Sequence, residues 1–503
     1  MPRKATAPDP FSALNALEVT PLEALFANDP ERLGRLTVDV AGVYFDWSKT
    51  HLDAAFLDAF AGIAEAQGFA QKREALFSGG IVNPTEKRPA THVAERGQGD
   101  PRHVAAASAN HQRMRSLIDA IEGGAFGDVS GILHIGIGGS ALGPELLLDS
   151  LGRASGNVGV SVLSNIDGQA VDDATDPLDP DSTLICAVSK TFTTAETLMN
   201  LESALGWMKE AGVDDPYGRV IAITANPQAA IDFGIDETRI LPFDEGVGGR
   251  YSLWSSVGFS AALALGWEAF EELLEGAATM DRHFRLAPAA ENAPMLAAFA
   301  DLLYTQRLGA ETRAVFAYDE RLRLLPSYLQ QLEMESNGKS VTADGKKLAG
   351  PSAAITWGGV GTDAQHAVFQ LLHQGTHLVP VEFLAVIQRA DDQDRRHHRS
   401  LLLNCFAQGA ALMVGDKSEE PYRAMPGNRP SSTILLERLD AATLGALIAF
   451  YEHRTFTAAC LVGINPFDQF GVELGKRIAR DLDDPEHASG FDLSTRQLIE
   501  RAL

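Results

Sequence analysis

Short apolar segments that alternate with longer helical segments constrain the fold of this chain more than any other feature. Four of these segments occupy residues 131–137, 159–165, 183–189 and 220–226, and each ends at or beside Gly, Ser, Thr or Asn. Apolar strands without polar alternation are covered on both faces, which is typical of parallel sheets flanked by helices. The pattern therefore predicts an α/β fold with a doubly wound, parallel-rich sheet.

A second set of apolar segments, at residues 313–319, 352–358 and 376–386, predicts a second sheet of the same kind. The length of 503 residues agrees with two or three domains, because one domain usually holds about 100–200 residues. We expect mostly helix and loop before residue 126, with an irregular surface stretch at 67–104, and a buried helix at 401–415.

The charge and the cysteine content exclude several classes of function. The net charge of −25 disfavours binding to nucleic acid or anionic lipid, and the sequence contains no basic stripe. The three cysteines lie far apart and form no CxxC pair, which indicates a reduced, cytoplasmic protein without a disulfide framework. No apolar run follows the basic residues near the N-terminus, and residues 401–415 are too few and too polar to span a bilayer. We therefore expect no signal peptide and no membrane or nucleic-acid partner.

The loop after the first apolar segment has the composition of an anion-binding loop. Gly136, Gly138, Gly139 and Ser140 precede a helical stretch, so main-chain N–H groups could face an anion at the positive helix end. The loop is not a dinucleotide-binding fingerprint, because its third glycine is misplaced and the acidic residue expected about twenty positions on is missing. A plain tight turn is the alternative interpretation.

The loop after the third apolar segment adds hydroxyl groups and one ammonium group. Its sequence, SKTFTTAET, contains Ser189, Lys190, Thr191 and Thr194. Such donors recognise a phosphate monoester, whereas a nucleotide P-loop would need GxxxxGK[ST]. A helix N-cap rich in hydroxyls is the alternative. Two such loops in one sheet favour anion binding, since ligands bind at the carboxyl ends of parallel strands.

Other charged residues do not reveal a function by themselves. Arg250 follows two glycines and could stabilise developing negative charge or form a structural pair with a carboxylate. Glu335, in MESNGK at residues 334–339, is either a solvated helix end or a base held beside a substrate. Glu473 and Lys476 have the spacing of an ordinary i, i+3 ion pair.

The histidines at residues 361–377 favour acid–base chemistry over metal binding. His373 and His377 have the i, i+4 spacing of metal ligands, but no Cys or carboxylate accompanies them at a familiar spacing. His366 follows a glycine-containing loop and is the better catalytic candidate. We therefore expect no metal site.

Six segments together resemble one family. GIGGSALGP, SKTFTTAET, EGVGGRYSLWSS, MESNGKS, GTDAQHAVFQLLHQGTH and FDQFGVELGK occur in the order found in the phosphoglucose isomerase family. They span residues 136–476, so the resemblance covers most of the chain. One departure is Gly-Thr-Asp-Ala before Gln-His, where the family more often has Gly-Thr-Asn-Gly or Gly-Thr-Asn-Ser; it adds a carboxylate, Asp363, near His366.

The resemblance implies a reaction and an architecture. The family interconverts glucose 6-phosphate and fructose 6-phosphate through an enediol, in glycolysis and gluconeogenesis, without a metal or organic cofactor. It implies two sugar-isomerase domains: a small one at 105–285, and a large one formed by 1–104 and 286–503. It also implies a homodimer whose active sites are shared between subunits.

The resemblance further implies a role for individual residues. Glu335 would be the proton-transfer base, Arg250 would stabilise the intermediate, and His366, from the partner subunit, would open the sugar ring with Lys476. Glu196 would orient this histidine. The residues expected to contact the substrate and its phosphate are Gly139, Ser140, Ser189, Lys190, Thr191, Thr194, Gln331 and Gln469.

Three other functions compete with this interpretation. A related isomerase acting on another hexose or pentose phosphate would have similar phosphate loops, but the set of Glu335, His366 and Lys476 favours the glucose 6-phosphate reaction. A sugar-phosphate sensor without turnover is disfavoured because Glu335 and Arg250 are both present. A nicotinamide enzyme is disfavoured by the imperfect glycine fingerprint.

Overall fold

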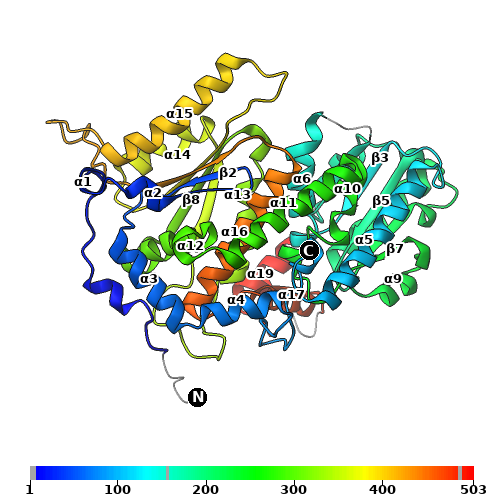
Figure 1. The fold of residues 1–503 in the computed structure, drawn as a ribbon. Helices are drawn as coiled ribbons and strands as arrows, with labels where there is room; N and C mark the ends of the chain where they lie inside the picture. Colours follow the sequence, from blue (N-terminus) through cyan, green and yellow to red (C-terminus); the bar gives the residue numbers. More distant parts are fainter. Residues whose placement is uncertain (1–6, 155–157, 485–489) are drawn as a thin grey trace. The chain divides into compact units, whose positions relative to one another are not determined.

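The computed structural model describes residues 7–154, 158–484 and 490–503, and the chain divides into two compact units that meet between Pro466 and Phe467. Over these described residues, the larger unit contains a five-stranded and a six-stranded β-sheet, both with helices packed against them (Figure 1). The predicted α/β fold with two parallel-rich sheets is confirmed.

The five-stranded sheet is parallel throughout and has the strand order β4-β3-β5-β6-β7. Four of its strands lie within the four apolar segments of the first set, so the prediction that these segments are strands is confirmed. The sequence does not predict β7, because three residues are too few to form a recognisable pattern. The strands are β3 (Gly131–Ile135), β4 (Gly159–Leu163), β5 (Thr183–Val188), β6 (Val220–Thr224) and β7 (Ile240–Pro242).

Helices that follow these strands pack their apolar sides onto the sheet. Leu201 and Met208 belong to the same buried cluster as Leu133 and Ile185 of the strands. The helices of this part of the chain are α5 (Pro101–Glu122), α6 (Leu142–Leu151), α7 (Gly168–Thr175), α8 (Ala195–Ala211), α9 (Pro227–Phe233) and α10 (Phe259–Leu265).

The six-stranded sheet has the order β1-β2-β11-β10-β8-β9, in which β8 to β11 are parallel and β1 and β2 are antiparallel. The three predicted strands of the second set are confirmed, whereas β11 and the hairpin formed by β1 and β2 were not expected. Ala41 and Gly42 have φ of 55° and 74°, which suits a tight hairpin turn within a region predicted to be mostly helix and loop. The strands are β1 (Thr37–Val40), β2 (Val43–Asp46), β8 (Thr312–Tyr318), β9 (Ile355–Val360), β10 (Val381–Val386) and β11 (Ser431–Leu436).

The helices around this sheet come from two stretches of the larger unit, residues 22–77 and residues 293–414. They are α1 (Leu22–Asn28), α2 (Arg32–Leu36), α3 (Ala54–Ala66), α4 (Phe69–Phe77), α12 (Ala293–Leu302), α13 (Leu325–Leu329), α14 (Asp363–Gln374) and α15 (Arg395–Val414). A π-helical segment, Gln330–Glu335, directly follows α13. The smaller unit contains α17 (Phe470–Asp483) and α19 (Leu493–Ala502).

Two long helices, α11 (Trp267–Leu286) and α16 (Ala441–Val462), lie side by side (Figure 1). A Cβ atom at Gly276 would lie 1.9 Å from the carbonyl oxygen of Ala442, and one at Gly445 would lie 2.1 Å from that of Leu273. The two glycines therefore let the helix backbones touch.

A buried ion cluster corrects the prediction of an irregular surface stretch at 67–104. Residues 69–77 form α4, and Arg96 is buried. The Arg96 guanidinium donates to Asp281 Oδ2 (2.8 Å) and Oδ1 (2.7 Å) and also pairs with Glu452. Trp254 Nε1 donates to Glu452 Oε1 at 2.8 Å. Arg96 thus joins α11 to α16, because its charge has buried carboxylate partners on both helices.

The prediction of a helix at 401–415 is confirmed, but the prediction that this helix is buried is wrong. This segment belongs to α15, in which only Cys405, Gly409 and Leu412 are buried. Leu403 and Phe406 are 52% and 45% exposed. Among the described residues, no helix is long and apolar enough to cross a membrane. The three cysteines are free and buried.

Replacing Arg96 tests the buried ion cluster. Arg96→Leu should lower the free energy of unfolding by about 3–5 kcal/mol, because it leaves two buried carboxylates without their cation. Denaturant unfolding followed by circular dichroism measures this change. Arg115→Leu is the control: Arg115 lies 3.6 Å from Glu271, both side chains are 55% exposed, and its loss should leave the midpoint nearly unchanged. Equal changes in both variants would contradict the account.

Candidate active site

Three segments that follow strands of the five-stranded sheet meet at its carboxyl edge. Residues 136–140 follow β3, residues 189–194 follow β5, and the turn at 244–250 follows β7. This is the edge where a doubly wound sheet binds its ligands. The contacts described next join these segments to each other and to residues 330–337.

The loop after β3 packs directly on the turn that carries Arg250. A Cβ atom at Gly139 would lie 2.2 Å from the carbonyl carbon of Gly249 and 2.5 Å from the nitrogen of Arg250. At Gly138, whose φ is +59°, it would lie 2.9 Å from Nε2 of Gln331. The structure therefore brings Gly139 together with Arg250 and Gly138 together with Gln331, and at position 139 only glycine leaves room for the neighbouring main chain.

A buried histidine holds the end of the same loop. His134 Nε2 lies 2.7 Å from the carbonyl oxygen of Ser140, and Nδ1 lies 2.8 Å from Ser260 Oγ. Burial lowers the pKa of His134 to about 4, so the ring is neutral near pH 7. It thus fixes Ser140 without adding charge to the loop.

The hydroxyl-rich loop after β5 is bound to the turn after β7 through Lys190. Lys190 Nζ donates to the carbonyl oxygens of Glu245 (2.7 Å) and Val247 (2.9 Å). Ser189 and Thr194 share a hydrogen bond of 3.0 Å between their hydroxyls. Burial lowers the pKa of Lys190 to about 8. An ammonium with this pKa and two neighbouring hydroxyls suits a phosphate group.

Thr191 lies at the exposed tip of this loop. Its Oγ1 accepts a hydrogen bond from Thr193 Oγ1 at 2.8 Å, and its carbonyl oxygen accepts one from Asn226 Nδ2 at 3.3 Å. Phe192, between the two threonines, is buried with a φ of 52°, which non-glycine residues rarely adopt. The loop is therefore held in a specific, strained shape.

Arg250 and Glu335 form the charged centre of the candidate site. Arg250 is buried, donates to Ser336 Oγ at 2.6 Å and to the Pro466 carbonyl oxygen, and its Nη1 lies 3.6 Å from Glu335 Oε1. Glu335 Oε2 is buried and accepts no hydrogen bond from any residue that the structure describes. A carboxylate held beside a cation, with one oxygen unengaged, can accept a proton from a bound molecule.

Sequence reasoning missed two residues that hold this pair. Ser336 is fully buried and accepts from Arg250, and the Tyr251 hydroxyl lies 2.9 Å from Ser336 Oγ. Burial raises the pKa of Tyr251 to about 12, so the phenol stays protonated. Both residues lie inside the motifs quoted above, but nothing in the motifs indicates that they face each other.

Other predicted residues are not joined to this centre. His366 is exposed on α14, and within the described part of the chain no hydrogen bond or ion pair links it or Glu196 to Glu335 or Arg250. Gln469 and Lys476 belong to the smaller unit, which has no determined position relative to the larger one. There Lys476 Nζ lies 3.9 Å from Glu473 Oε1, the i, i+3 pair that the spacing predicts.

The weak metal-binding pattern does not form a site. His373 Nε2 lies 3.0 Å from Gln408 Oε1, and His377 lies beyond the end of α14. Over residues 7–154, 158–484 and 490–503, no group of three or more His, Cys, Asp or Glu side chains is placed to hold a metal ion.

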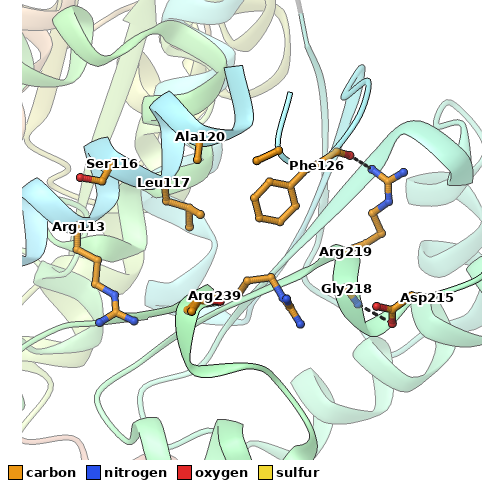
Figure 2. Close-up of a pocket in the computed structure, with 11 residues that line it drawn as sticks. Arg113, Ser116, Leu117, Ala120, Phe126, Asp215, Gly218, Arg219 and Arg239 are labelled. Atoms are coloured by element: carbon orange, nitrogen blue, oxygen red, sulfur yellow. Dashed lines mark hydrogen bonds between the residues drawn. The ribbon is translucent and has the colours of Figure 1, made fainter. Parts of the chain in front are cut away.

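A separate cleft of about 650 Å³ lies beside α5 and the amino ends of β6 and β7. Figure 2 shows Arg113, Arg219 and Arg239 in its lining. Arg219 donates to the carbonyl oxygens of Phe126 (2.7 Å) and Asp181 (2.6 Å), and Arg113 donates to that of Glu237 (2.6 Å). None of the predicted site residues lines this cleft, and Arg113 and Arg219 bind main-chain carbonyl groups around it.

Comparisons with known proteins agree with the fold and the motifs. The sequence model of the phosphoglucose isomerase family matches residues 46–499. The glucose-6-phosphate isomerase of Rhizorhabdus wittichii is 66% identical and covers 98% of this chain and 99% of its own; that of Zymomonas mobilis is 59% identical over 99% of both. The crystal structure of a glucose-6-phosphate isomerase from Chlamydia trachomatis has a TM-score of 0.88 and 30% identity, over 98% of each chain.

Fold, motifs and relatives together define an aldose–ketose isomerase. The chain belongs to the phosphoglucose isomerase family, as the resemblance predicted.

Replacing Gly139 tests the contact between the loops. Gly139→Ala should reduce kcat/KM for isomerisation by about 10²-fold, because a methyl group would push Arg250 away by roughly 1 Å. Gly206→Ala is the control: a Cβ there meets nothing within 4 Å, so activity should be unchanged. Steady-state kinetics on both variants measures the difference. Full activity of Gly139→Ala would show that the loops do not depend on this contact.

Proposed function

We propose that this protein interconverts glucose 6-phosphate and fructose 6-phosphate, in glycolysis and gluconeogenesis, with Glu335 as the proton-transfer base. One observation carries the proposal: Glu335 has a buried, unengaged Oε2, while its Oε1 lies 3.6 Å from the Arg250 guanidinium. A carboxylate with one oxygen free of hydrogen-bond donors can accept a proton, and the cation beside it can stabilise negative charge that develops on the substrate.

The chemistry explains why these two residues are paired. The reaction moves one proton between C2 and C1, so a single base on one face of the substrate can remove it and return it. The enediol intermediate gathers negative charge on oxygen, which the permanently charged Arg250 can stabilise. Buried contacts to Ser336 and Pro466 keep the guanidinium in place during this change.

The loops at the carboxyl edge of the sheet would hold the phosphate. The Lys190 ammonium and the neighbouring hydroxyls supply charged and neutral donors, and the Gly139 loop lies against the turn that carries Arg250. Binding energy from the remote phosphate would then position the reacting carbons. The proposed contacts are Gly139, Ser140, Ser189, Lys190, Thr191, Thr194, Gln331 and Gln469.

Ring opening would use His366 with Lys476, and Glu196 would orient the histidine. We propose that His366 acts in the active site of the partner subunit of a homodimer. In support, His366 lies exposed on α14, and α14 and α15 carry exposed apolar side chains. These are Leu371 (43%), Leu403 (52%), Phe406 (45%) and Val414 (52%), which a partner could cover.

We also retain two further proposals from the sequence. The small domain would be 105–285 and the large domain 1–104 with 286–503, which agrees with the two sheets lying at 131–242 and at 37–46 with 312–436. A cytoplasmic location is supported by the three free cysteines.

A coupled assay tests the proposed reaction. Purified protein receives fructose 6-phosphate, and formation of glucose 6-phosphate is followed with and without EDTA. Turnover that resists EDTA is expected, since the proposed mechanism uses side chains alone. Binding of fructose 6-phosphate without turnover would instead indicate a sensor, and turnover of a different sugar phosphate alone would indicate another isomerase.

Removing the charge of Glu335 should abolish the proton transfer and spare binding. Glu335→Gln keeps the shape of the side chain but cannot act as a base, so kcat should fall by about 10²–10⁴-fold. The dissociation constant for fructose 6-phosphate, measured by calorimetry, should change little. Glu271→Gln, on an exposed part of α11, is the control and should be fully active. A near-normal kcat in Glu335→Gln would disprove the assignment.

The pKa of Lys190 predicts how phosphate binding depends on pH. This pKa of about 8 means that the ammonium loses its proton as pH rises through 8, so kcat/KM, which reports the free enzyme, should fall above that pH. Lys190→Arg should remove this fall, because a guanidinium stays charged. Kinetics between about pH 7 and 9.5 compares the two proteins, since substrate phosphate is already a dianion there. Identical profiles would rule out Lys190 as the cause.

A further inference from the structure

A buried cluster of arginines and carboxylates lies directly behind the segment that carries Glu335. Its members come from β8, β10, α12, α16 and the π-helical segment Gln330–Glu335. Arg313, Glu382 and Arg454 are 5%, 1% and 3% exposed. Among the described residues, no hydrogen bond or ion pair joins Arg313, Glu382 or Arg454 to the proposed substrate loops.

Glu333 binds this segment to the six-stranded sheet. The Arg313 guanidinium pairs with both carboxylate oxygens of Glu333, at 2.6 Å to Oε2, and Thr356 Oγ1 donates to the same Oε2 at 2.5 Å. Arg313 on β8 and Thr356 on β9 are direct partners in the parallel ladder. Glu333 is thus held by two neighbouring strands at once.

The arginine that holds Glu333 is itself rigidly placed. Arg313 Nη1 donates to Glu382 Oε1 at 3.0 Å, and Glu382 Oε2 accepts from Arg454 Nη1 at 2.7 Å. Arg454 also donates to both carboxylate oxygens of Asp301, each at 2.6 Å. Burial alone would raise the pKa of Glu382, but Arg454 and Arg313 lower it below its usual value, so it stays ionised.

Little water can replace a lost partner in this cluster. The cavity beside Arg313, Glu333 and Arg454 has a volume of about 40 Å³, which holds at most a few water molecules. A charge left unpaired there would destabilise the protein, because little water could solvate it. The pairing of arginines and carboxylates seen in the cluster is therefore strongly preferred.

The position of Glu335 depends on its neighbours along the chain. Its own carboxylate has one oxygen 3.6 Å from Arg250 and the other without a donor, so no hydrogen bond to a described residue aims it. The residues on either side are anchored instead: Glu333 to the sheet, Ser336 to Arg250, and Asn337 Nδ2 to the Thr455 carbonyl oxygen at 3.1 Å. Residues two apart on a helix face different directions, so Glu333 can hold the sheet while Glu335 faces Arg250.

We propose that Glu333, Arg313 and Thr356 are positioning residues that aim the Glu335 carboxylate at the substrate. This inference rests on the proposed role of Glu335 as the base. The anchor fixes the backbone two residues before Glu335, and a displacement of about 1 Å at a reacting group can cost 10²-fold in rate. The three residues affect the rate without touching the substrate.

The test replaces Glu333 by glutamine and compares kinetics with stability. Glu333→Gln keeps the side-chain volume but removes the charge that Arg313 holds, so kcat should fall about 10-fold or more. KM for fructose 6-phosphate should stay within about two-fold, because the phosphate loops are not touched. Thr356→Val, which removes one hydrogen bond only, should lower kcat in the same direction by a smaller factor.

Asp301→Asn is the matched control. Asp301 accepts two hydrogen bonds from one arginine of the same cluster, and its side chain is 24% exposed against 13% for Glu333. Its hydrogen-bond partner is Arg454 on α16, whereas Arg313 Nε lies 3.8 Å from Asp301 Oδ1, too far for a hydrogen bond. Asp301→Asn should lower the melting temperature by about as much as Glu333→Gln and leave kcat unchanged.

The outcomes separate this inference from the proposed function. Inactive wild-type protein in the coupled assay would reject the proposed function itself. Active wild type with an unchanged kcat in Glu333→Gln would reject the positioning role, as would equal losses of kcat in Glu333→Gln and Asp301→Asn. If Glu333→Gln does not fold, Thr356→Val decides: a lower kcat at unchanged KM supports the inference, and an unchanged kcat overturns it.

Discussion

The buried Arg250 guanidinium is the interaction on which the rest of the candidate site depends. It is hydrogen-bonded to Ser336 and to the Pro466 carbonyl oxygen, it lies beside Glu335, and its main-chain nitrogen packs on Gly139. One residue therefore joins the turn after β7 to the loop after β3, through its main chain, and to the π-helical segment after α13, through its side chain. A guanidinium keeps its charge at any physiological pH, so these contacts do not loosen when nearby groups titrate. Arg250 therefore connects three segments of the chain and can also stabilise negative charge beside Glu335.

Much of the fold was predictable because buried parallel strands have a distinctive local composition. The seven predicted strands are all present, since each is a short apolar run between turn residues. The errors arose where local composition misleads. The charged residues near Arg96 suggested a surface, although Arg96 itself pairs with buried carboxylates on two distant helices. The apolar run in α15 suggested burial, but a helix with apolar residues on several sides is buried only if a neighbour covers them.

The sequence predicted the main residues of the candidate site but not the contacts that hold them in position. Motifs named Arg250, Glu335 and the phosphate loops, because loops at the carboxyl ends of parallel strands converge whatever their separation in sequence. The anchor of Glu333 on Arg313 and Thr356 was not predictable, since it joins residues from three elements through side chains that are individually ordinary. His366 and Lys476 remain predictions, because one is exposed on α14 and the other lies in the separate C-terminal unit.

The most direct test of the central claim is to determine the source of the hydrogen that the product carries at C2. Fructose 6-phosphate would be converted in D₂O and the product examined by NMR. Proton transfer through Glu335 predicts deuterium at C2 in at least part of the glucose 6-phosphate formed, because exchange of the carboxyl proton with solvent competes with its return to the substrate. Product that forms at the normal rate without any deuterium at C2 would contradict the account, since hydrogen would then pass directly between the two carbons without a base.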